Sequence, residues 1–149
     1  MNLELKGKKA IVLGGTRGIG RAIAETLARE GAYVGICARN GAQVQEAVEA
    51  LKAQGVSATG TSVDITDGQA LKAWIAAAGA ELGGIDVLVS NAGAMAQGAD
   101  PASWEQNFKL DVLGAVNAFD AAHPFLAAAA AKHGDAAFVI IASVSAAVA

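Results

Sequence analysis

Short apolar runs alternate with amphipathic helical patterns along this chain of 149 residues. Strands that alternate with helices in this way pair in parallel, because each helix returns the chain to the same edge of the sheet. The runs are almost continuously apolar, as in strands that are covered on both faces. The sequence therefore predicts an α/β fold with a doubly wound parallel sheet, whose ligands lie beyond the carboxyl ends of the strands. The predicted strands cover residues 10–13, 33–37, 58–63, 86–90 and 138–142.

The helix predicted before the last strand is the longest. Asp100 and Pro101 provide an N-cap and a first-turn proline, and Ser103 and Gln106 have the spacing of a capping box. We expect the helix to continue to Lys132. Its predicted buried stripe consists of Phe108, Val112, Ala115 and Phe119.

Charge and composition exclude several classes of protein. The formal net charge is -3, which gives no reason to expect a nucleic-acid partner, because binding to a phosphate backbone requires a clustered basic surface. The single cysteine, Cys37, cannot form an internal disulfide, which suits a reducing compartment. The N-terminal apolar run is too short for a signal peptide, and His123 and His133 lack the spacing of metal ligands. We therefore expect a cytoplasmic protein with no metal, nucleic-acid or membrane partner.

The segment Leu13–Gly20, LGGTRGIG, follows the first predicted strand and begins the first helix. Glycine allows a positive φ and a close approach of the backbone to a ligand, and a helix N-terminus favours phosphate. A Walker A loop would require Lys and then Ser or Thr, where this chain has Arg21 and Ala22. The glycines at 14, 18 and 20 instead indicate a dinucleotide-binding turn that is longer than the common GxGxxG. The alternative is a tight turn without a ligand.

The residue that follows the second strand distinguishes between two dinucleotides. An acidic residue there would bind the ribose 2′-hydroxyl of NAD, and an arginine would accept the 2′-phosphate of NADP. This chain has Arg39 without an acidic neighbour, and Arg17 extends from the glycine turn towards the same region. Two guanidinium groups can bind one phosphate through charge-assisted hydrogen bonds. The pattern therefore favours NADPH over NADH, unless Arg39 is only a solvated loop charge.

Three segments together resemble the short-chain dehydrogenase/reductase family. They are GGTRGIG after the first strand, Asp64 at the end of the third, and SNAG, residues 90–93, at the end of the fourth. The resemblance covers all 149 residues and implies an NAD(P)-binding Rossmann domain. Leu13 departs from the threonine that usually begins the family's glycine turn.

The resemblance implies roles for individual residues. The glycine turn would admit the pyrophosphate, Asp64 would bind the adenine amino group, and the Asn-Ala-Gly segment would run past the nicotinamide ribose. Without a ligand, Asp64 would be a turn or cap residue and Asn91 would brace a loop. The implied cofactor-binding residues are Gly14, Thr16, Arg17, Gly18, Ile19, Gly20, Arg39, Asn40, Asp64, Ile65, Asn91, Ala92 and Gly93.

The resemblance also implies two catalytic residues. Ser143 follows the fifth strand, where the family's serine hydrogen-bonds the substrate carbonyl. Asp111 occupies the position of the family's catalytic asparagine, because Asn107 lies one turn too early. We expect Asp111 to point partly inward, into the active site. The family's Tyr-x-x-x-Lys motif is absent from the chain, and the single tyrosine, Tyr33, opens the second strand.

We therefore expect an NADP(H)-dependent oxidoreductase that transfers a hydride between nicotinamide and a carbonyl or alcohol substrate. The resemblance implies a homodimer or a homotetramer. We expect the chain to be the incomplete, cofactor-binding part of a longer protein, and to be inactive alone. The alternative is a non-catalytic dinucleotide-binding module or an inactive fragment. A Tyr-x-x-x-Lys motif after Ala149 would support the oxidoreductase.

Overall fold

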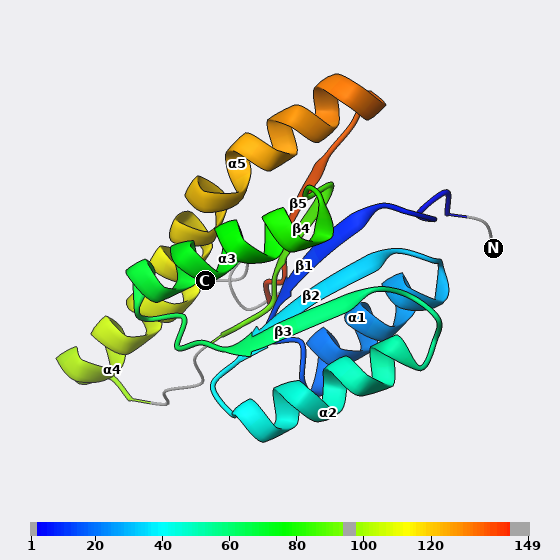
Figure 1. Ribbon diagram of the computed structural model, residues 1–149. Coiled ribbons are helices and arrows are strands. Elements are labelled where there is room, and N and C mark those ends of the chain that lie inside the picture. Colours follow the sequence, from blue (N-terminus) through cyan, green and yellow to red (C-terminus); the bar gives the residue numbers. More distant parts are fainter. Residues whose placement is uncertain (1–2, 94–97, 144–149) are drawn as a thin grey trace.

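A five-stranded parallel sheet forms the centre of the protein. The computed structural model describes residues 3–93 and 98–143, and the strand order is β3-β2-β1-β4-β5 (Figure 1). The order reverses between β1 and β4, which confirms the doubly wound parallel sheet. The strands are β1 (Lys9–Leu13), β2 (Tyr33–Ala38), β3 (Ala58–Ser62), β4 (Val87–Ser90) and β5 (Ala137–Ile140).

Helices cover both faces of the sheet. The helices α1 and α2 lie on one face, and α3 and α5 lie on the other (Figure 1). The N-cap of α2 is Asn40, whose side chain accepts a hydrogen bond from the backbone N–H of Gln43 at 3.1 Å. Asp67 caps α3 in the same way. The helices are α1 (Gly18–Arg29), α2 (Gly41–Lys52), α3 (Gly68–Leu82), α4 (Pro101–Asn107) and α5 (Gly114–His133).

Successive residues of β1 belong to cores on opposite faces of the sheet. Ile11 and Leu13 pack in the core that includes α3 and α5, and Val12 packs in the core that includes α1 and α2. Because side chains alternate between the faces of a strand, a strand covered on both faces is apolar at every position. The edge strand β5 differs, since Val139 and Ile140 are 42% and 54% exposed.

The carboxyl ends of β1, β2 and β4 lie at one edge of the sheet. Leu13 is opposite both Cys37 of β2 and Ser90 of β4. The backbone N–H of Gly14 donates to the carbonyl oxygen of Cys37 at 2.9 Å, so the glycine turn begins directly after the last paired residue of β1. The segments that follow the three strands therefore meet at the same edge.

The long helix before β5 is divided into three parts, because a π-helical segment, η1 (Phe108–Leu113), separates α4 from α5. Asp100 is the N-cap, and its Oδ1 atom accepts a hydrogen bond from the backbone N–H of Ser103 at 3.0 Å. Pro101 occupies the first turn, as predicted. The capping box predicted from Ser103 and Gln106 is wrong, because Ser103 lies inside α4 and its hydroxyl donates to Asp100.

Of the stripe predicted for this long helix, only Ala115 is buried. Phe108, Val112 and Phe119 are 53%, 45% and 38% exposed. A π-helical turn holds more residues than an α-helical turn, so residues on either side of η1 that have α-helical spacing do not lie on the same side of the long helix. The predicted stripe therefore does not follow the buried face. Mostly small side chains fill that face and allow α5 to approach α3 closely. The buried residues of α5 are Gly114, Ala115, Ala118, Ala122, Leu126 and Ala129.

The segment Pro101–His133 is long and apolar enough to cross a membrane by length and composition alone, with a mean hydropathy of 1.2. A core helix passes the same test. Ala118, Ala122 and Leu126 belong to the core that α5 shares with α3. We therefore describe the segment as part of this domain.

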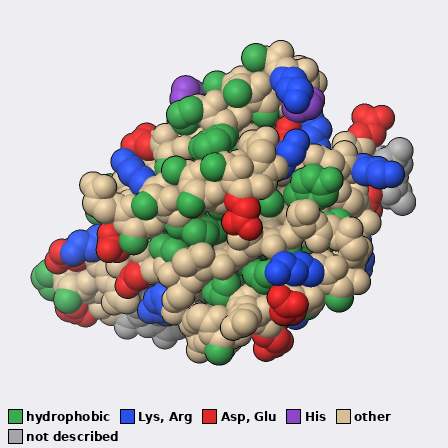
Figure 2. Space-filling model, in the orientation of Figure 1, with side chains coloured by type: hydrophobic (Ala, Val, Ile, Leu, Met, Phe, Trp, Pro, Cys, Tyr) green, Lys and Arg blue, Asp and Glu red, His purple; other side chains and the backbone are tan. Residues whose placement is uncertain are grey.

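Charged side chains of both signs are scattered over the face shown in Figure 2. Some form exposed pairs, such as Lys72 of α3 with Asp120 of α5, whose Nζ and Oδ2 atoms are 3.4 Å apart. Exposed pairs of this kind contribute at most about 1 kcal/mol to stability. The fold therefore depends mainly on its two apolar cores.

Candidate functional site

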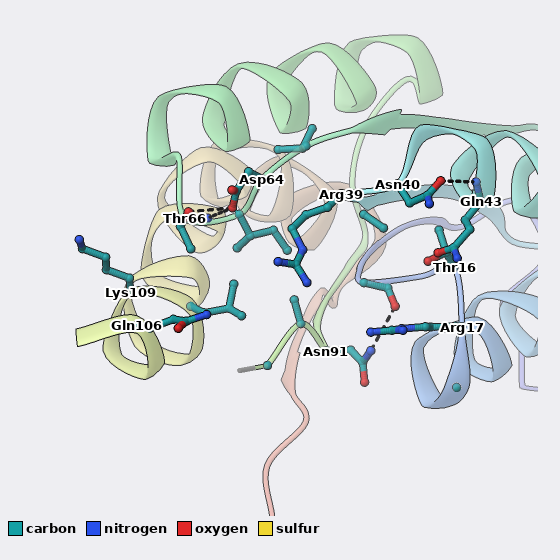
Figure 3. A pocket seen from close by; sticks show the side chains of 18 of the residues that line it. Thr16, Arg17, Arg39, Asn40, Gln43, Asp64, Thr66, Asn91, Gln106 and Lys109 are labelled. Atoms are coloured by element: carbon teal, nitrogen blue, oxygen red, sulfur yellow. Dashed lines mark hydrogen bonds between the residues drawn. The ribbon is translucent and has the colours of Figure 1, made fainter. Parts of the chain in front are cut away.

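A cleft of about 980 Å³ lies at the carboxyl ends of the strands. Its walls come from the turn after β1, the segments after β2, β3 and β4, and one side of α4 and η1 (Figure 3). A doubly wound sheet opens such a cleft where its strand order reverses. The lining residues are Gly14, Thr16, Arg17, Gly18, Ile19, Ala38, Arg39, Asn40, Gln43, Val63, Asp64, Ile65, Thr66, Asn91, Ala92, Gly93, Ala102, Glu105, Gln106, Lys109 and Leu110.

The turn between β1 and α1 forms part of the cleft wall. Gly14 and Gly18 have φ angles of 71° and 55°, which glycine adopts without strain. Arg17 is the N-cap of α1, but its side chain makes no capping hydrogen bond. The N–H groups in the first turn of α1 therefore have no acceptor from the cap. Together with the helix dipole, they suit a phosphate group.

Gly20 lies beneath the glycine turn and is buried. A Cβ atom there would overlap the carbonyl oxygen of Gly14 and the Nδ2 atom of Asn91. Asn91 donates a hydrogen bond to that carbonyl oxygen across 3.3 Å. Gly20 is the one predicted cofactor-binding residue that does not line the cleft, and it permits the close packing of the turn against Asn91.

Arg17 and Arg39 both point into the cleft, from the glycine turn and from the end of β2 (Figure 3). Within residues 3–93 and 98–143, neither guanidinium group forms a salt bridge. The backbone of Arg39 is held by the hydroxyl of Ser62, which donates to its carbonyl oxygen at 2.7 Å. This side of the cleft therefore offers two positive charges to an anion.

Asp64 follows β3 and contributes a carboxylate to the cleft wall. Its Oδ1 atom accepts hydrogen bonds from the backbone N–H and the hydroxyl of Thr66, at 3.0 and 2.7 Å. The Thr66 hydroxyl, then the Thr66 N–H and the positive charge of Arg39, lower the pKa of the Asp64 carboxyl from its ordinary value. Asp64 is therefore an ionised hydrogen-bond acceptor at neutral pH.

Neither of the two predicted catalytic residues lines the cleft. Asp111 lies in η1 and is exposed. Its Oδ1 atom lies 3.5 Å from the position that a Cβ atom would take on Gly93, next to the cleft wall. Ser143 is exposed after the end of β5.

The sequence reasoning missed the contribution of α4 and η1 to the cleft. Residues 102, 105, 106, 109 and 110 form its remaining wall. Glu105 and Lys109 pair across 2.6 Å, and this hydrogen bond lowers the pKa of Glu105. Their separation by four positions was visible in the sequence. The side of the helix that faces the cleft was not, because tertiary packing decides how the helix crosses the sheet.

The described residues contain no group of three or more His, Cys, Asp or Glu side chains that could hold a metal ion. The cleft combines an open helix N-terminus, two guanidinium groups and an ionised carboxylate. This arrangement can bind an elongated ligand that carries phosphate groups at one side and a hydrogen-bond donor at the other.

Residues 8–149 match the sequence profile of the family described as short chain dehydrogenase. The chain belongs to the short chain dehydrogenase family. The resemblance read from the glycine turn, Asp64 and residues 90–93 is therefore confirmed.

Two relatives illustrate how much of a short chain dehydrogenase this chain covers. Isoepoxydon dehydrogenase patN of Penicillium expansum is 34% identical over 125 residues, which are 82% of this chain and 48% of the relative. Dehydrogenase/reductase SDR family member 4 of Oryctolagus cuniculus is 47% identical over 88 residues, which are 59% of this chain and 34% of the relative. The chain thus matches half of these relatives' length or less.

Solved structures of similar proteins share the whole described fold. The NADH-dependent reductase A1-R′, solved with NAD, superposes with a TM-score of 0.89 at 31% identity, covering 98% of this chain and 63% of that one. The L-sorbose reductase of Gluconobacter frateurii, solved with NADPH and L-sorbose, gives a TM-score of 0.86 at 32% identity, covering 98% of this chain and 56% of that one. The two reductases bind different dinucleotides on one fold.

Proposed function

We propose that this short chain dehydrogenase binds NADP(H) and takes part in hydride transfer between the nicotinamide and a carbonyl or alcohol substrate. The observation that carries the proposal is the pair Arg17 and Arg39, which both enter the cleft. The cleft residues contributed by the end of β2 and the start of α2 are Ala38, Arg39, Asn40 and Gln43, and none of them is acidic. An NAD site would use a carboxylate in this region to bind the ribose 2′-hydroxyl.

The cleft fits the parts of a dinucleotide phosphate. The N-terminus of α1 and the glycine turn would bind the pyrophosphate. The guanidinium groups of Arg17 and Arg39 would hold the 2′-phosphate through charge-assisted hydrogen bonds, and Asn40 would border it. Asp64 would accept a hydrogen bond from the adenine amino group, and Ile65 would pack beside the base. Thr16, Ile19 and the segment Asn91–Gly93 would line the path towards the nicotinamide.

The bound nicotinamide supplies or takes up the hydride. Ser143 would donate a hydrogen bond to the substrate oxygen as charge develops there. Asp111, beside Gly93, would hold or move a proton at the same end of the cleft. We further propose that the substrate is a small carbonyl compound or alcohol.

A second candidate function is dinucleotide binding without turnover by these residues alone. It is favoured by the position of Tyr33, which begins β2 at the end remote from the cleft. The cleft residues that the structure describes therefore include no tyrosine that could act as an acid or base. Hydride transfer to a carbonyl substrate by the 149-residue chain would exclude this second function.

The proposal is tested by measuring the dissociation constants of NADPH and NADH with the purified chain. We expect the wild type to bind NADPH at least about tenfold more tightly, because a charged hydrogen bond contributes about 1.5–3 kcal/mol. Arg39→Ala should remove most of that preference by weakening NADPH alone. Arg29→Ala, at the end of α1 and outside the cleft, provides the matched control and should bind both nucleotides like the wild type.

Two results would contradict the proposal. One is equal affinity of the wild type for NADPH and NADH. The other is an equal loss of both affinities in Arg39→Ala, which would mean that Arg39 does not read the 2′-phosphate.

A further inference from the structure

We propose that Thr66 is a positioning residue for adenine recognition, which holds one carboxylate oxygen of Asp64 so that the other faces the amino group of the base. The inference rests on the proposed dinucleotide site, and it adds a residue to which that proposal assigns no role. It concerns how the base is selected rather than how the phosphates are bound.

The hydrogen bonds of Asp64 are unequally divided between its two oxygens. Oδ1 accepts both the N–H and the hydroxyl of Thr66, at 3.0 and 2.7 Å (Figure 3). Among the described residues, Oδ2 accepts no hydrogen bond. A carboxylate has lone pairs on both oxygens, so the arrangement leaves one oxygen available to a ligand in the cleft.

The backbone around Thr66 is fixed on both sides. The N–H of Asp67 donates to the carbonyl oxygen of Asp64 at 3.0 Å, which closes a turn between β3 and α3. The side chain of Asp67 then caps α3, and Ile65 between the two polar residues is only 5% exposed. A Cβ atom on Gly114 would lie 2.7 Å from Cγ2 of Ile65, so Ile65 is packed tightly against the start of α5. With Ile65 fixed inward, Asp64 and Thr66 are both held on the exposed side.

The charges around Asp64 favour its ionised form. Thr66 makes the largest contribution to the lowered pKa of Asp64, and Arg39 at the end of β2 adds a smaller one. The other charged groups in or beside the cleft are Arg17, Asp67, Asp111 and the pair Glu105 and Lys109, which are 2.6 Å apart. Loss of the Thr66 donors should therefore raise the pKa of Asp64 towards its ordinary value.

An ionised acceptor distinguishes adenine from hypoxanthine. The 6-amino group of adenine donates a hydrogen bond, whereas the 6-oxo group of hypoxanthine presents a lone pair to the same carboxylate oxygen. A site that offers a hydrogen-bond acceptor favours a base that donates to it over an analogue that cannot, because the carboxylate loses that hydrogen bond and meets a second lone pair instead. Thr66 would strengthen this selection by fixing both the direction and the charge of Asp64.

The experiment compares the dissociation constants of NADP⁺ and of its hypoxanthine analogue, measured by calorimetry with the 149-residue chain at pH 7 and pH 4. We expect the wild type to prefer NADP⁺ at least about tenfold. Thr66→Val keeps the shape and the backbone N–H but removes the hydroxyl. It should weaken NADP⁺ about fivefold at pH 7, and the ratio of its dissociation constant to that of the wild type should grow at pH 4, close to the ordinary pKa of an aspartate, where more of its Asp64 is protonated. Titration of the 2′-phosphate cancels in that ratio.

Thr66→Ser retains the hydroxyl and should restore the affinity and the pH dependence of the wild type. Thr61→Val makes the same chemical change on β3, outside the cleft, and should bind like the wild type. Thermal unfolding of each variant checks that it is folded.

The outcomes separate this inference from the function on which it depends. If the wild type and Asp64→Ala bind NADP⁺ and the hypoxanthine analogue equally well, the contact between Asp64 and the base is wrong, and the inference fails with it. If the wild type discriminates and Asp64→Ala does not, but Thr66→Val keeps the full affinity, discrimination and pH profile, the role of Thr66 alone is overturned.

Discussion

The Nδ2 atom of Asn91, at the end of β4, lies 3.3 Å from the carbonyl oxygen of Gly14, in the turn after β1. The two residues are 77 positions apart in the sequence. Their hydrogen bond connects the two central strands at the point where the cleft opens, next to the glycine turn that forms part of its wall. The shape of the glycine turn therefore depends on a side chain from a neighbouring strand.

Replacing Asn91 tests this connection. Asn91→Ala removes the donor and should lower the free energy of unfolding by about 1 kcal/mol, and it should weaken NADPH binding because the turn loses a support. Asn91→Asp is the sharper variant, since its carboxylate would face the Gly14 carbonyl oxygen and repel it. We expect a larger loss of stability in Asn91→Asp at pH 7, measured by urea unfolding. Equal stability of both variants and the wild type would show that the hydrogen bond is unimportant.

Gly20→Ala should disturb the same turn, because Gly20 of α1 packs directly against it. The added Cβ atom would overlap the Gly14 carbonyl oxygen and Nδ2 of Asn91, so we expect a loss of about 1–3 kcal/mol through overpacking. Gly41→Ala is the matched control, because Gly41 also begins a helix and the nearest atom to its added Cβ would be 3.6 Å away. In urea unfolding, Gly41→Ala should be at least as stable as the wild type, because alanine has a higher helix propensity than glycine. A Gly20→Ala protein as stable as the control would contradict the argument.

Several features of the fold could be predicted because they depend on local chemistry. The apolar runs identified β1, β2 and β4, since a strand buried on both faces has no polar position. The more polar β3 and the exposed edge strand β5 were predicted from the alternation of short strands with helical patterns. Asp100 and Pro101 identified the start of α4 for a similar reason: a cap satisfies the N–H groups of its own helix. The glycine turn, Arg39, Asp64 and Asn91 fell on one cleft because parallel strands bring their carboxyl ends to one edge.

Features that depend on tertiary packing could not be predicted. The π turns of η1 changed which side of the long helix is buried, so Phe108 and Phe119 were wrongly predicted to lie in the core. Thr66 was missed because a threonine two residues after an aspartate is common in turns, and only the structure shows which carboxylate oxygen it occupies.

The side chain of Asp86 supports the opposite end of the sheet. It is 4% exposed, its Oδ2 atom accepts a hydrogen bond from the backbone N–H of Lys9 at 2.8 Å, and Oδ1 lies 3.8 Å from both Lys8 Nζ and His133 Nε2. Asp86→Ala would leave the backbone N–H of Lys9 and the Lys8 ammonium without this partner, so we expect the free energy of unfolding, measured in urea, to fall by about 3 kcal/mol. Asp86→Asn keeps an acceptor for the backbone N–H of Lys9, so its free energy of unfolding should fall less.

NADPH affinity is the second measurement for Asp86. The side chain lies at the amino end of the strands, whereas the cleft lies at their carboxyl ends, so the folded variants should bind NADPH like the wild type. A binding defect at temperatures where the variant is fully folded would contradict this separation of the two ends.

The buried thiol of Cys37 should make stability depend on alkaline pH. Cys37 is fully buried in β2, and this burial raises the pKa of its thiol to about 12. In the unfolded chain the thiol ionises near pH 8.5, at roughly its ordinary pKa. Above that pH the unfolded state has lost a proton that the folded state retains, so the free energy of unfolding falls as pH rises, by up to about 1.4 kcal/mol for each pH unit, until the folded thiol also ionises. Below about pH 8 the contribution is fully present.

Cys37→Ala isolates this effect, because every other titrating group is the same in the two proteins. We expect the free energy of unfolding, measured in urea, to fall more steeply with pH for the wild type than for Cys37→Ala between pH 8 and about pH 10.5. The native thiol should also react far more slowly with a disulfide reagent at pH 8 than the unfolded thiol does, since only the thiolate attacks. Parallel pH dependence of the two proteins, together with rapid reaction of the native thiol, would mean that Cys37 ionises in the folded state and that its burial in β2 does not suppress the thiolate.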